Sequence, residues 1–323
     1  MTASAAHASP VFVGVDVAKK GWDVHLLPAG KSLKLAADEA GLATLVAELT
    51  PFGNALIVME ASGGYERELA AELVAAGHRV AVVNPRQVRD FARGVGILAK
   101  TDALDARVLA QFAMQAQLRL LEKLPAKQGE LDALVTRRRQ LIELRTMEKN
   151  RLGQASCAAT RKSIVHILDA IRKQLRDVDR LILKLIESHD DWRRTAEIVQ
   201  SVPGVGPVTS ATLVAELPEL GKLGRQAIAA LAGLAPYNND SGTFQGKRSI
   251  RGGRASVRTA LYMAALSGIR HNPMLTRFAG RLRSLGKPAK VVITACMRTL
   301  LTLLNTLVRN QTNWNPQMQT AEA

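Results

Sequence analysis

Four acidic residues in the first third of the chain have the types and positions that metal-dependent chemistry requires. Asp16 interrupts an otherwise apolar segment, VFVGVDV, and Glu60 ends another, ALIVME. Asp102 and Asp105 stand at positions i and i+3, so a helix would carry both on one face. A carboxylate in apolar surroundings is costly unless it is paired or bound to a metal. These four acids are therefore candidate ligands of a cation.

Each of these acids also has an ordinary structural explanation. Thr101 is suited to cap a helix that begins at Asp102, and the helix dipole favours acids in a first turn. Asp16 could serve as a turn residue. Both explanations stay open for any one acid alone. The order of a strand Asp, a strand-end Glu and a helical Asp-x-x-Asp favours a shared site.

The residue types available to a metal favour a hard cation. Carboxylate oxygens suit Mg²⁺ or Mn²⁺, whereas zinc prefers histidine or thiolate. The six histidines show no ligand spacing, and the two cysteines, Cys157 and Cys296, lie far apart. The cysteine spacing also argues against a disulfide framework and favours a reducing compartment. Two hard cations about 3.5–4 Å apart can stabilise the attacking and leaving oxygens of a phosphodiester.

A second kind of candidate is a hydroxyl in a long polar segment. Residues 235–254 form a glycine-rich stretch that contains Ser241 and Gly242, between segments with helical periodicity. Long polar loops of this kind are often functional. A turn residue is the simpler explanation for Ser241, and no histidine lies nearby to act as a base. A hydrolase triad is therefore not supported.

The acids require elements that bring them together. The sequence predicts strands over 11–17, 22–27, 55–59 and 79–83, where β-branched and apolar residues dominate. Helical periodicity covers 39–49, 65–76 and 101–116. Alternation of strands and helices at this spacing predicts an α/β domain over residues 10–123.

A helical arm is expected next, over residues 124–196. Apolar residues recur there at helical intervals with few Gly or Pro residues. Arg137, Arg138 and Arg139 lie between the apolar positions, which favours contact with phosphates. An antiparallel helix pair with a coiled-coil-like character fits the pattern, and we expect it to support a homo-oligomer.

The last region, residues 197–310, is predicted to be mainly α-helical. Residues 198–217 indicate two helices around a turn with Gly204 and Gly206, as in a helix-hairpin-helix, which would present backbone amides to a phosphate. Further helices are expected over 226–234, 256–269 and 289–308. Basic candidates for nucleic-acid contact in this region are Lys247, Arg248, Arg251, Arg254 and Arg258.

The charge distribution separates these regions. The chain of 323 residues has 44 basic and 28 acidic side chains, a net charge of +16. Residues 1–120 balance at zero, 121–200 carry +5 and 201–323 carry +11, and 241–321 hold 13 cations and no acid. Such an excess favours a polyanionic partner, a ribosome-like or membrane-surface protein being the alternative. We expect no signal peptide and no membrane span.

The motifs together resemble the DEDD transposases of bacterial insertion sequences, the Piv-like group that includes bridge-RNA-guided recombinases. The resemblance covers nearly the whole chain. The segments VGVDVAK, MEASG and KTDALDA match the N-terminal domain of that family. The segments SVPGVG, AGLAP, SG at Ser241 and LYM match its C-terminal domain.

The resemblance implies a fold, a site and partners. It implies an RNase H-like (RuvC-like) N-terminal domain in which Asp16, Glu60, Asp102 and Asp105 hold Mg²⁺ or Mn²⁺. Ser241 would be the nucleophile that forms a transient covalent link with DNA, at a site composed across domains or subunits. The partners would be double-stranded donor and target DNA and a noncoding guide RNA, in the bacterial cytoplasm at the nucleoid.

Two other functions remain open at the level of the sequence. One is a RuvC-like nuclease in which metal-activated water attacks and Ser241 only binds. The other is a nucleic-acid-binding protein without catalysis.

Overall fold

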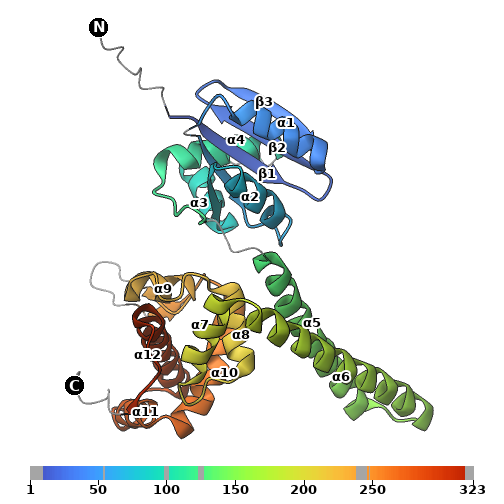
Figure 1. Cartoon of the computed structure of the whole chain (residues 1–323), viewed down its shortest axis with the longest axis vertical. Helices are drawn as coiled ribbons and strands as arrows, with labels where there is room; N and C mark the ends of the chain where they lie inside the picture. Colours follow the sequence, from blue (N-terminus) through green and yellow to red (C-terminus); the bar gives the residue numbers. More distant parts are fainter. Residues whose placement is uncertain are drawn as a thin grey trace. The chain divides into compact units, whose positions relative to one another are not determined.

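The computed structural model describes residues 10–53, 55–97, 102–122, 127–237, 246 and 248–316, with the side chains of 102–104 left out. Ser241, Lys247 and Thr101 lie outside this description. The chain divides into two compact units, Met1–Ala126 and Lys127–Ala323 (Figure 1). The boundary lies near the predicted end of the α/β domain. The second predicted boundary, at 196–197, falls inside a helix, and the three-part division stays a prediction.

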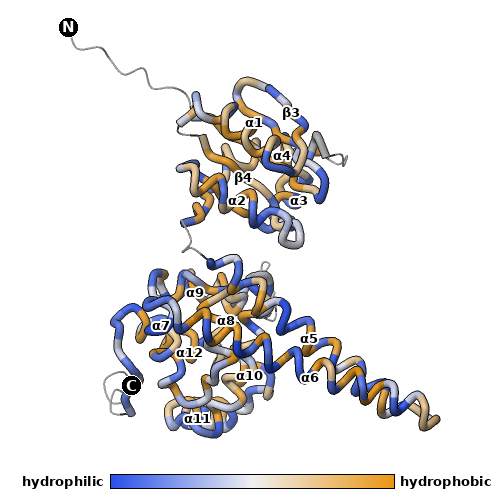
Figure 2. Tube along the Cα trace, turned by 45° about the vertical axis from the view of Figure 1, so that its right-hand side comes forward, coloured by the Kyte–Doolittle hydropathy of each residue, from blue (hydrophilic) through white to orange (hydrophobic). Residues whose placement is uncertain are grey.

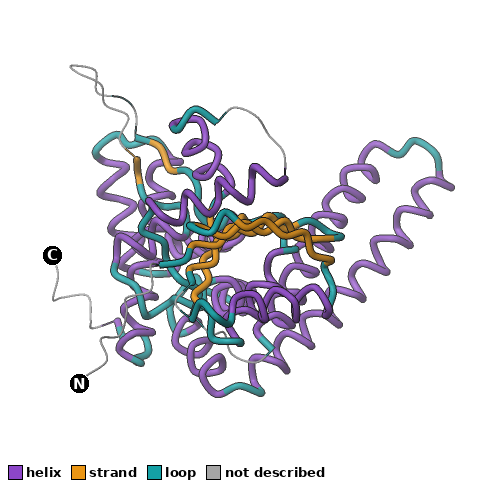
Figure 3. Tube along the Cα trace, turned by 90° about the horizontal axis from the view of Figure 1, so that it is seen from above, coloured by secondary structure: helices purple, strands orange, loops and turns teal. Residues whose placement is uncertain are grey.

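The first unit is built on a mixed five-stranded sheet, which forms one twisted layer (Figure 3). Its strand order is β3-β2-β1-β4-β5. The first three strands pair antiparallel, whereas β1, β4 and β5 run parallel to one another. The strands are β1 (Phe12–Val17), β2 (Gly21–Leu27), β3 (Lys31–Ala36), β4 (Leu56–Glu60) and β5 (Arg79–Val83).

Helices cover both faces of this sheet, which confirms the predicted α/β domain. One face packs Val13 and Val15 against Leu45 of α1 and Leu73 of α2. The opposite face packs Val58 and other strand residues against α3 and α4. The helices are α1 (Glu39–Leu49), α2 (Glu66–Ala75), α3 (Pro85–Gly94) and α4 (Asp102–Gln115). The sequence analysis did not predict β3 or α3.

The predicted helical arm is an antiparallel pair, α5 (Gln128–Gln154) and α6 (Ala158–Glu187). Apolar and polar residues alternate along both helices (Figure 2). Leu131 and Leu141 of α5 and Leu175 and Ile182 of α6 belong to one buried cluster, which extends to Ala215. The base of the pair is thus packed into the second unit.

The remainder of the second unit is mainly helical, as predicted. A single core joins its helices, with Ile198, Leu213, Leu261 and Leu300 among its fully buried side chains. A small two-stranded sheet pairs β6 with β7. The elements are α7 (Asp190–Gln200), α8 (Pro207–Glu216), α9 (Arg225–Leu231), β6 (Pro236–Tyr237), β7 (Ser249–Ile250), α10 (Ala255–His271), α11 (Pro273–Ser284) and α12 (Ala289–Asn310).

Helix α12 is the one helix in the described part of the chain that is long and apolar enough to cross a membrane. Half of its apolar window is nevertheless buried within the protein. Val292, Cys296, Leu300 and Leu304 lie on the buried side, in the core of the second unit. Its apolar composition is accounted for by this packing.

Candidate active site

Asp16 and Glu60 lie on neighbouring strands, at the same edge of the sheet. The parallel register pairs Gly14 with Val58 and Val15 with Met59, so the next residues along are Asp16 and Glu60. Residues that face each other across neighbouring strands share one face, and the strands are about 4.8 Å apart. Both acids are half-buried. The fold therefore places two of the four predicted acids side by side at the carboxyl end of two parallel strands.

Helix α4 packs directly on the face that carries these acids. A Cβ added to Gly14 would lie 1.9 Å from the Ala106 carbonyl oxygen and 2.5 Å from the Ala110 nitrogen. Only glycine allows this approach. Asp16 is two residues along β1, about 6.6 Å from Gly14 and on the same face. Asp105 directly precedes Ala106. Strand β1 and helix α4 therefore each carry an acid close to the point where Gly14 meets Ala106.

Both helical acids lie in the first turn of α4, as the sequence predicts. Asp105 is half-buried. The side chain of Asp102 is outside the described residues. Within the described residues, no three His, Cys, Asp or Glu side chains come together as a metal group. The described acids Asp16, Glu60 and Asp105 nevertheless offer carboxylate oxygens, the ligands that a hard cation prefers.

A fifth carboxylate lies in the same row and was missed by the sequence analysis. Asp23 of β2 pairs directly with Asp16, and Lys34 of β3 pairs with Asp23. The Lys34 ammonium is 3.3 Å from an Asp23 carboxylate oxygen. A row of Lys34, Asp23, Asp16 and Glu60 therefore crosses four strands. The alternating pattern of residues 22–27 was the available signal, since it predicts one face for Asp23 and His25.

His25 lies beneath α4 on this face, opposite Gly14. Its Nδ1 forms a hydrogen bond of 2.8 Å with the Ser32 hydroxyl. Burial, and secondarily the charge of Arg107, lower the pKa of His25 below its ordinary value. The imidazole is thus favoured in its neutral form, which avoids a second cation beside Arg107.

Ser241 lies outside the described residues, and the small sheet lies on either side of it in the sequence. In this sheet Pro236 pairs with Ile250 and Tyr237 with Ser249. The Arg251 guanidinium lies 5.1 Å from the centre of the Tyr237 ring. Arg258 donates a hydrogen bond of 2.7 Å to the Gly252 carbonyl. Both arginines therefore have contacts at or next to this sheet.

Several arginines predicted to contact nucleic acid take part in intramolecular ion pairs. Arg138 Nε is 2.5 Å from Asp179 Oδ1 on the partner helix of the arm. Arg139 donates to Glu216 Oε1 at 2.9 Å. Arg137, by contrast, donates to the side chain of Gln140, one turn along the exposed surface of α5.

Arg254 has the most extensive of these contacts. Its two terminal nitrogens bind both carboxylate oxygens of Glu219, the Nη2–Oε1 distance being 2.8 Å, and Nη1 also donates to the Glu216 carbonyl. The Glu219 side chain is only 10% exposed. Arg254 therefore neutralises a buried carboxylate. Arg248, in contrast, is exposed.

The predicted glycine turn joins α7 to α8. Gly204 has a φ of +103°, and an added Cβ would lie 2.5 Å from the Gly268 Cα of α10. Gly206 is the N-cap of α8, and an added Cβ there would meet nothing within 4 Å. Gly204 is thus required for packing inside the unit, whereas the backbone at Gly206 is accessible.

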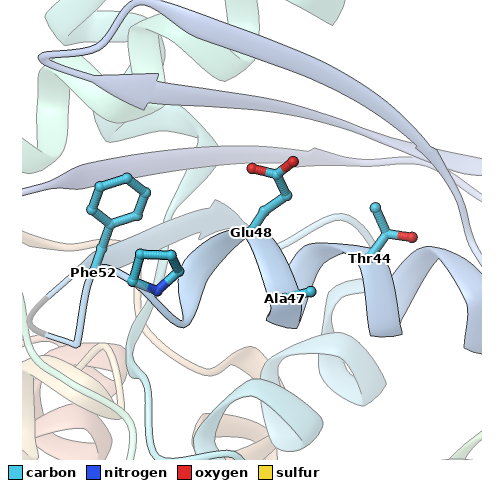
Figure 4. A pocket seen from close by; sticks show the side chains of 5 residues that line it. Thr44, Ala47, Glu48 and Phe52 are labelled. Atoms are coloured by element: carbon cyan, nitrogen blue, oxygen red, sulfur yellow. The ribbon is translucent and has the colours of Figure 1, made fainter.

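An open depression on the first unit lies apart from the acids. It is lined by Thr44, Glu48, Phe52 and their neighbours on and after α1 (Figure 4). Helix α1 covers the opposite face of the sheet from α4. The Lys31 ammonium binds Glu48 at 2.7 Å. We assign this depression no part in the chemistry of Asp16 and Glu60.

Two family models match most of the chain. A transposase model of the DEDD type found in IS110 matches residues 13–155, and a model described as the transposase IS116/IS110/IS902 family matches 196–279. Together they cover 227 of the 323 residues, since 143 and 84 residues are matched.

Relatives that match the chain over most of its length are also proteins of gene inversion and insertion elements. The chain is 28% identical to the pilin gene-inverting protein of Moraxella bovis over 93% of this chain and 96% of that protein. It is 25% identical to the 42 kDa protein of insertion element IS900 from Mycobacterium paratuberculosis, over 98% and 100% of the two chains. The chain therefore belongs to the IS110, IS116 and IS902 family of DNA transposases and recombinases, enzymes that cleave DNA and transfer its strands.

Proposed function

We propose that this protein is the transposase or site-specific recombinase of an insertion sequence, and that it cuts and rejoins DNA through a serine nucleophile assisted by divalent metal. The observation that carries the proposal is the register that sets Asp16 beside Glu60 on the face covered by α4. The sheet order, with three antiparallel strands followed by two parallel ones, supports an RNase H-like first unit. The α7–α8 turn supports a helix-hairpin-helix in the second.

Asp16, Glu60, Asp102 and Asp105 would hold Mg²⁺ or Mn²⁺. Bound there, the cation would offset negative charge on the oxygens that attack and leave the phosphorus. The half-buried position of Asp16 and Glu60 fits this task, since a cation bound between two adjacent carboxylates would offset their mutual repulsion.

Ser241 would supply the attacking oxygen. Its hydroxyl loses a proton, a bond forms between Oγ and phosphorus, and the bond between phosphorus and the 3′ oxygen breaks. The leaving 3′ oxygen takes up a proton. The phosphoserine ester conserves the energy of the broken bond, so a second strand can reverse the exchange. The pairing of β6 with β7, which precede and follow Ser241 in the sequence, supports a fixed anchor for this segment.

The partners we propose are double-stranded donor and target DNA and a structured noncoding RNA that selects their sequences. A homo-oligomer would complete the site, with the α5–α6 pair as its contact. Exposed apolar side chains on that pair, Leu144, Met147 and Ile167, support an oligomeric contact. The protein would act in the bacterial cytoplasm.

A trapped protein–DNA adduct tests the nucleophile. Wild-type protein with Mg²⁺, donor DNA and flanking RNA should give an adduct that resists denaturation, and Ser241→Ala should give none. A neighbouring hydroxyl provides the matched control, and Ser249→Ala should keep the adduct. An adduct of equal yield in Ser241→Ala would refute the serine mechanism. Cleavage without an adduct in the wild type would instead favour a nuclease that uses water.

Removal of the metal, or of one of its proposed ligands, tests the metal site. EDTA or Asp16→Asn should lower strand cleavage by about 10²- to 10³-fold, the size typical for loss of a main charge-stabilising group. Asp90→Asn, on the exposed surface of α3, is the control and should cleave like the wild type. Full cleavage in EDTA would exclude the metal site. Normal strand transfer by Asp16→Asn would favour a protein without catalysis at these acids.

A further inference from the structure

The cations of the second unit fall into two groups according to their surroundings. Arg254 and Arg139 bind the buried carboxylates of Glu219 and Glu216. Arg309 donates to the carbonyls of Gly221 and Leu223. These side chains are held by the fold. In the part of the chain that the structure describes, the cations at the end of α11 and the start of α12 have no such partners.

We define the α11–α12 edge by Arg281, Arg283, Lys287 and Lys290. All four are exposed. Among the described residues none of them forms an ion pair with a carboxylate, and the sequence from 241 to 321 contains no acid. Four positive charges within ten residues (281–290) therefore face solvent without compensation.

A contact with an aromatic ring holds one cation of this edge against the core. The Arg281 guanidinium lies 5.4 Å from the centre of the Phe278 ring, and Phe278 packs on the core cluster. Arg281, Arg283 and Lys290 are carried by two helices that pack on one core, and Lys287 lies in the turn that joins these helices.

The turn between the helices adds an apolar side chain to the cations. Leu285 is 65% exposed and lies between Arg283 and Lys287 in the chain. Folding gains little from a leucine in this position. Proteins that bind the minor groove of DNA frequently insert apolar side chains, leucine among them, between base steps.

We propose that the α11–α12 edge is a contact surface for the phosphate backbone of duplex DNA. The inference rests on the proposed function only for the identity of the polyanion. Duplex DNA fits because the family acts on DNA and because the edge offers four exposed charges within ten residues. Contacts to phosphate position a protein on DNA without reading sequence. The edge therefore contributes affinity and orientation, in addition to whatever selects the target.

Salt dependence of binding tests the edge. The triple variant Arg281→Gln, Lys287→Gln and Lys290→Gln is compared with the full-length wild type on one 40-base-pair duplex, without RNA, from 50 to 300 mM salt. The slope of log K against log[salt] is negative, and each lost phosphate contact reduces its magnitude by about 0.9. The magnitude should therefore fall by about 3 in the triple variant. The affinity at 0.1 M salt should fall by about 10²- to 10³-fold.

A matched control carries the same change of charge elsewhere. Arg172→Gln, Arg180→Gln and Arg193→Gln remove three exposed arginines that pair with acids one turn away on α6 and α7. Its slope should stay within about 1 of the wild type. An equal fall in both triple variants would reduce the effect to net charge and overturn the proposal, as would an unchanged slope in the edge variant.

Two further measurements, on a double variant and on duplex RNA, distinguish the remaining explanations of a change in slope. Lys287→Gln with Lys290→Gln leaves the Arg281–Phe278 contact intact and should still lower the slope by about 2. A duplex RNA of equal length identifies the polyanion, and a loss confined to RNA would overturn the assignment to DNA. Wild-type protein that binds DNA through this edge but forms no Ser241 adduct would refute the serine mechanism and leave the edge standing.

Discussion

The central arginines of the second unit, Arg138, Arg139 and Arg254, differ from the α11–α12 edge in what lies beside them. Each central arginine is within 3 Å of a carboxylate oxygen. The cations of the edge have no carboxylate beside them among the described residues. Each of these cations adds one unit to the net charge, whatever lies beside it. In the first region the charge balances neighbouring acids, two of them buried, and in the second it remains available to a partner.

The two glycines of the α7–α8 turn repeat this difference at the level of the backbone. Gly204 approaches α10, whereas Gly206 faces open space. A motif that is typical of phosphate binding thus contains one residue for packing and one for access. Charge and motif therefore indicate the function of a region, while contacts decide which residues within it can meet a ligand.

Gly204→Ala should have the largest effect on stability. The new Cβ would lie 2.5 Å from the Gly268 Cα, and the φ of +103° is unfavourable for alanine. Overpacking and backbone strain together should lower the free energy of unfolding by about 3 kcal/mol. Urea denaturation measures it. Gly206→Ala is the control and should cost about 1 kcal/mol or less, since alanine only replaces a better N-cap. Equal losses at the two positions would contradict the distinction between them.

Arg254→Ala should have the next largest effect on stability. It leaves the Glu219 carboxylate buried without its bidentate partner, and a loss of about 2–3 kcal/mol is expected. Arg254→Lys keeps the charge but not the fork geometry, and it should recover part of the loss. The slope of DNA affinity with salt should not change in either variant. A slope lower by about 0.9 would show instead that Arg254 meets a phosphate.

The sequence could predict the elements that carry the acids, because strand and helix patterns are local. It predicted Asp16 within a strand, Glu60 at a strand end and Asp105 in a first turn, and the structure confirms these positions. The register between β1, β2 and β4 is not local. It sets Asp23 beside Asp16, and no pattern within one strand specifies that neighbour.

Two helices were missed although their starting signals are present. Both α3 and α11 begin with Asn-Pro, at Asn84 and Asn272, where the Asn side chain accepts hydrogen bonds from the first turn and Pro occupies the first helical position. The sequence analysis predicted the strand over 79–83 that precedes the first of these pairs, but not the helix that follows it. The acids that pair with Arg138, Arg139 and Arg254 could not be predicted from the sequence for another reason. Asp179, Glu216 and Glu219 lie 41, 77 and 35 residues from the arginines they bind.

Lys287→Gln should have the smallest effect on stability and yet change binding. Lys287 is exposed in the turn before α12 and makes no contact with a carboxylate in the described part of the protein, so the free energy of unfolding should stay within about 0.5 kcal/mol. Loss of one phosphate contact should lower the affinity for duplex DNA at 0.1 M salt by about 8-fold and the salt slope by about 0.9. Lys287→Arg, which keeps the charge, should bind like the wild type.

The single substitution also separates two ways in which the edge could act. If its cations meet phosphates one by one, Lys287→Gln accounts for about a third of the fall in slope of the triple variant, because independent contacts add. If the edge acts only through the total charge of the unit, Lys287→Gln also lowers the affinity. In that case, changing the charge of an exposed residue far from the edge on the same unit has a similar effect on affinity. Contact with phosphate predicts that position matters, and equal effects from remote positions would contradict it.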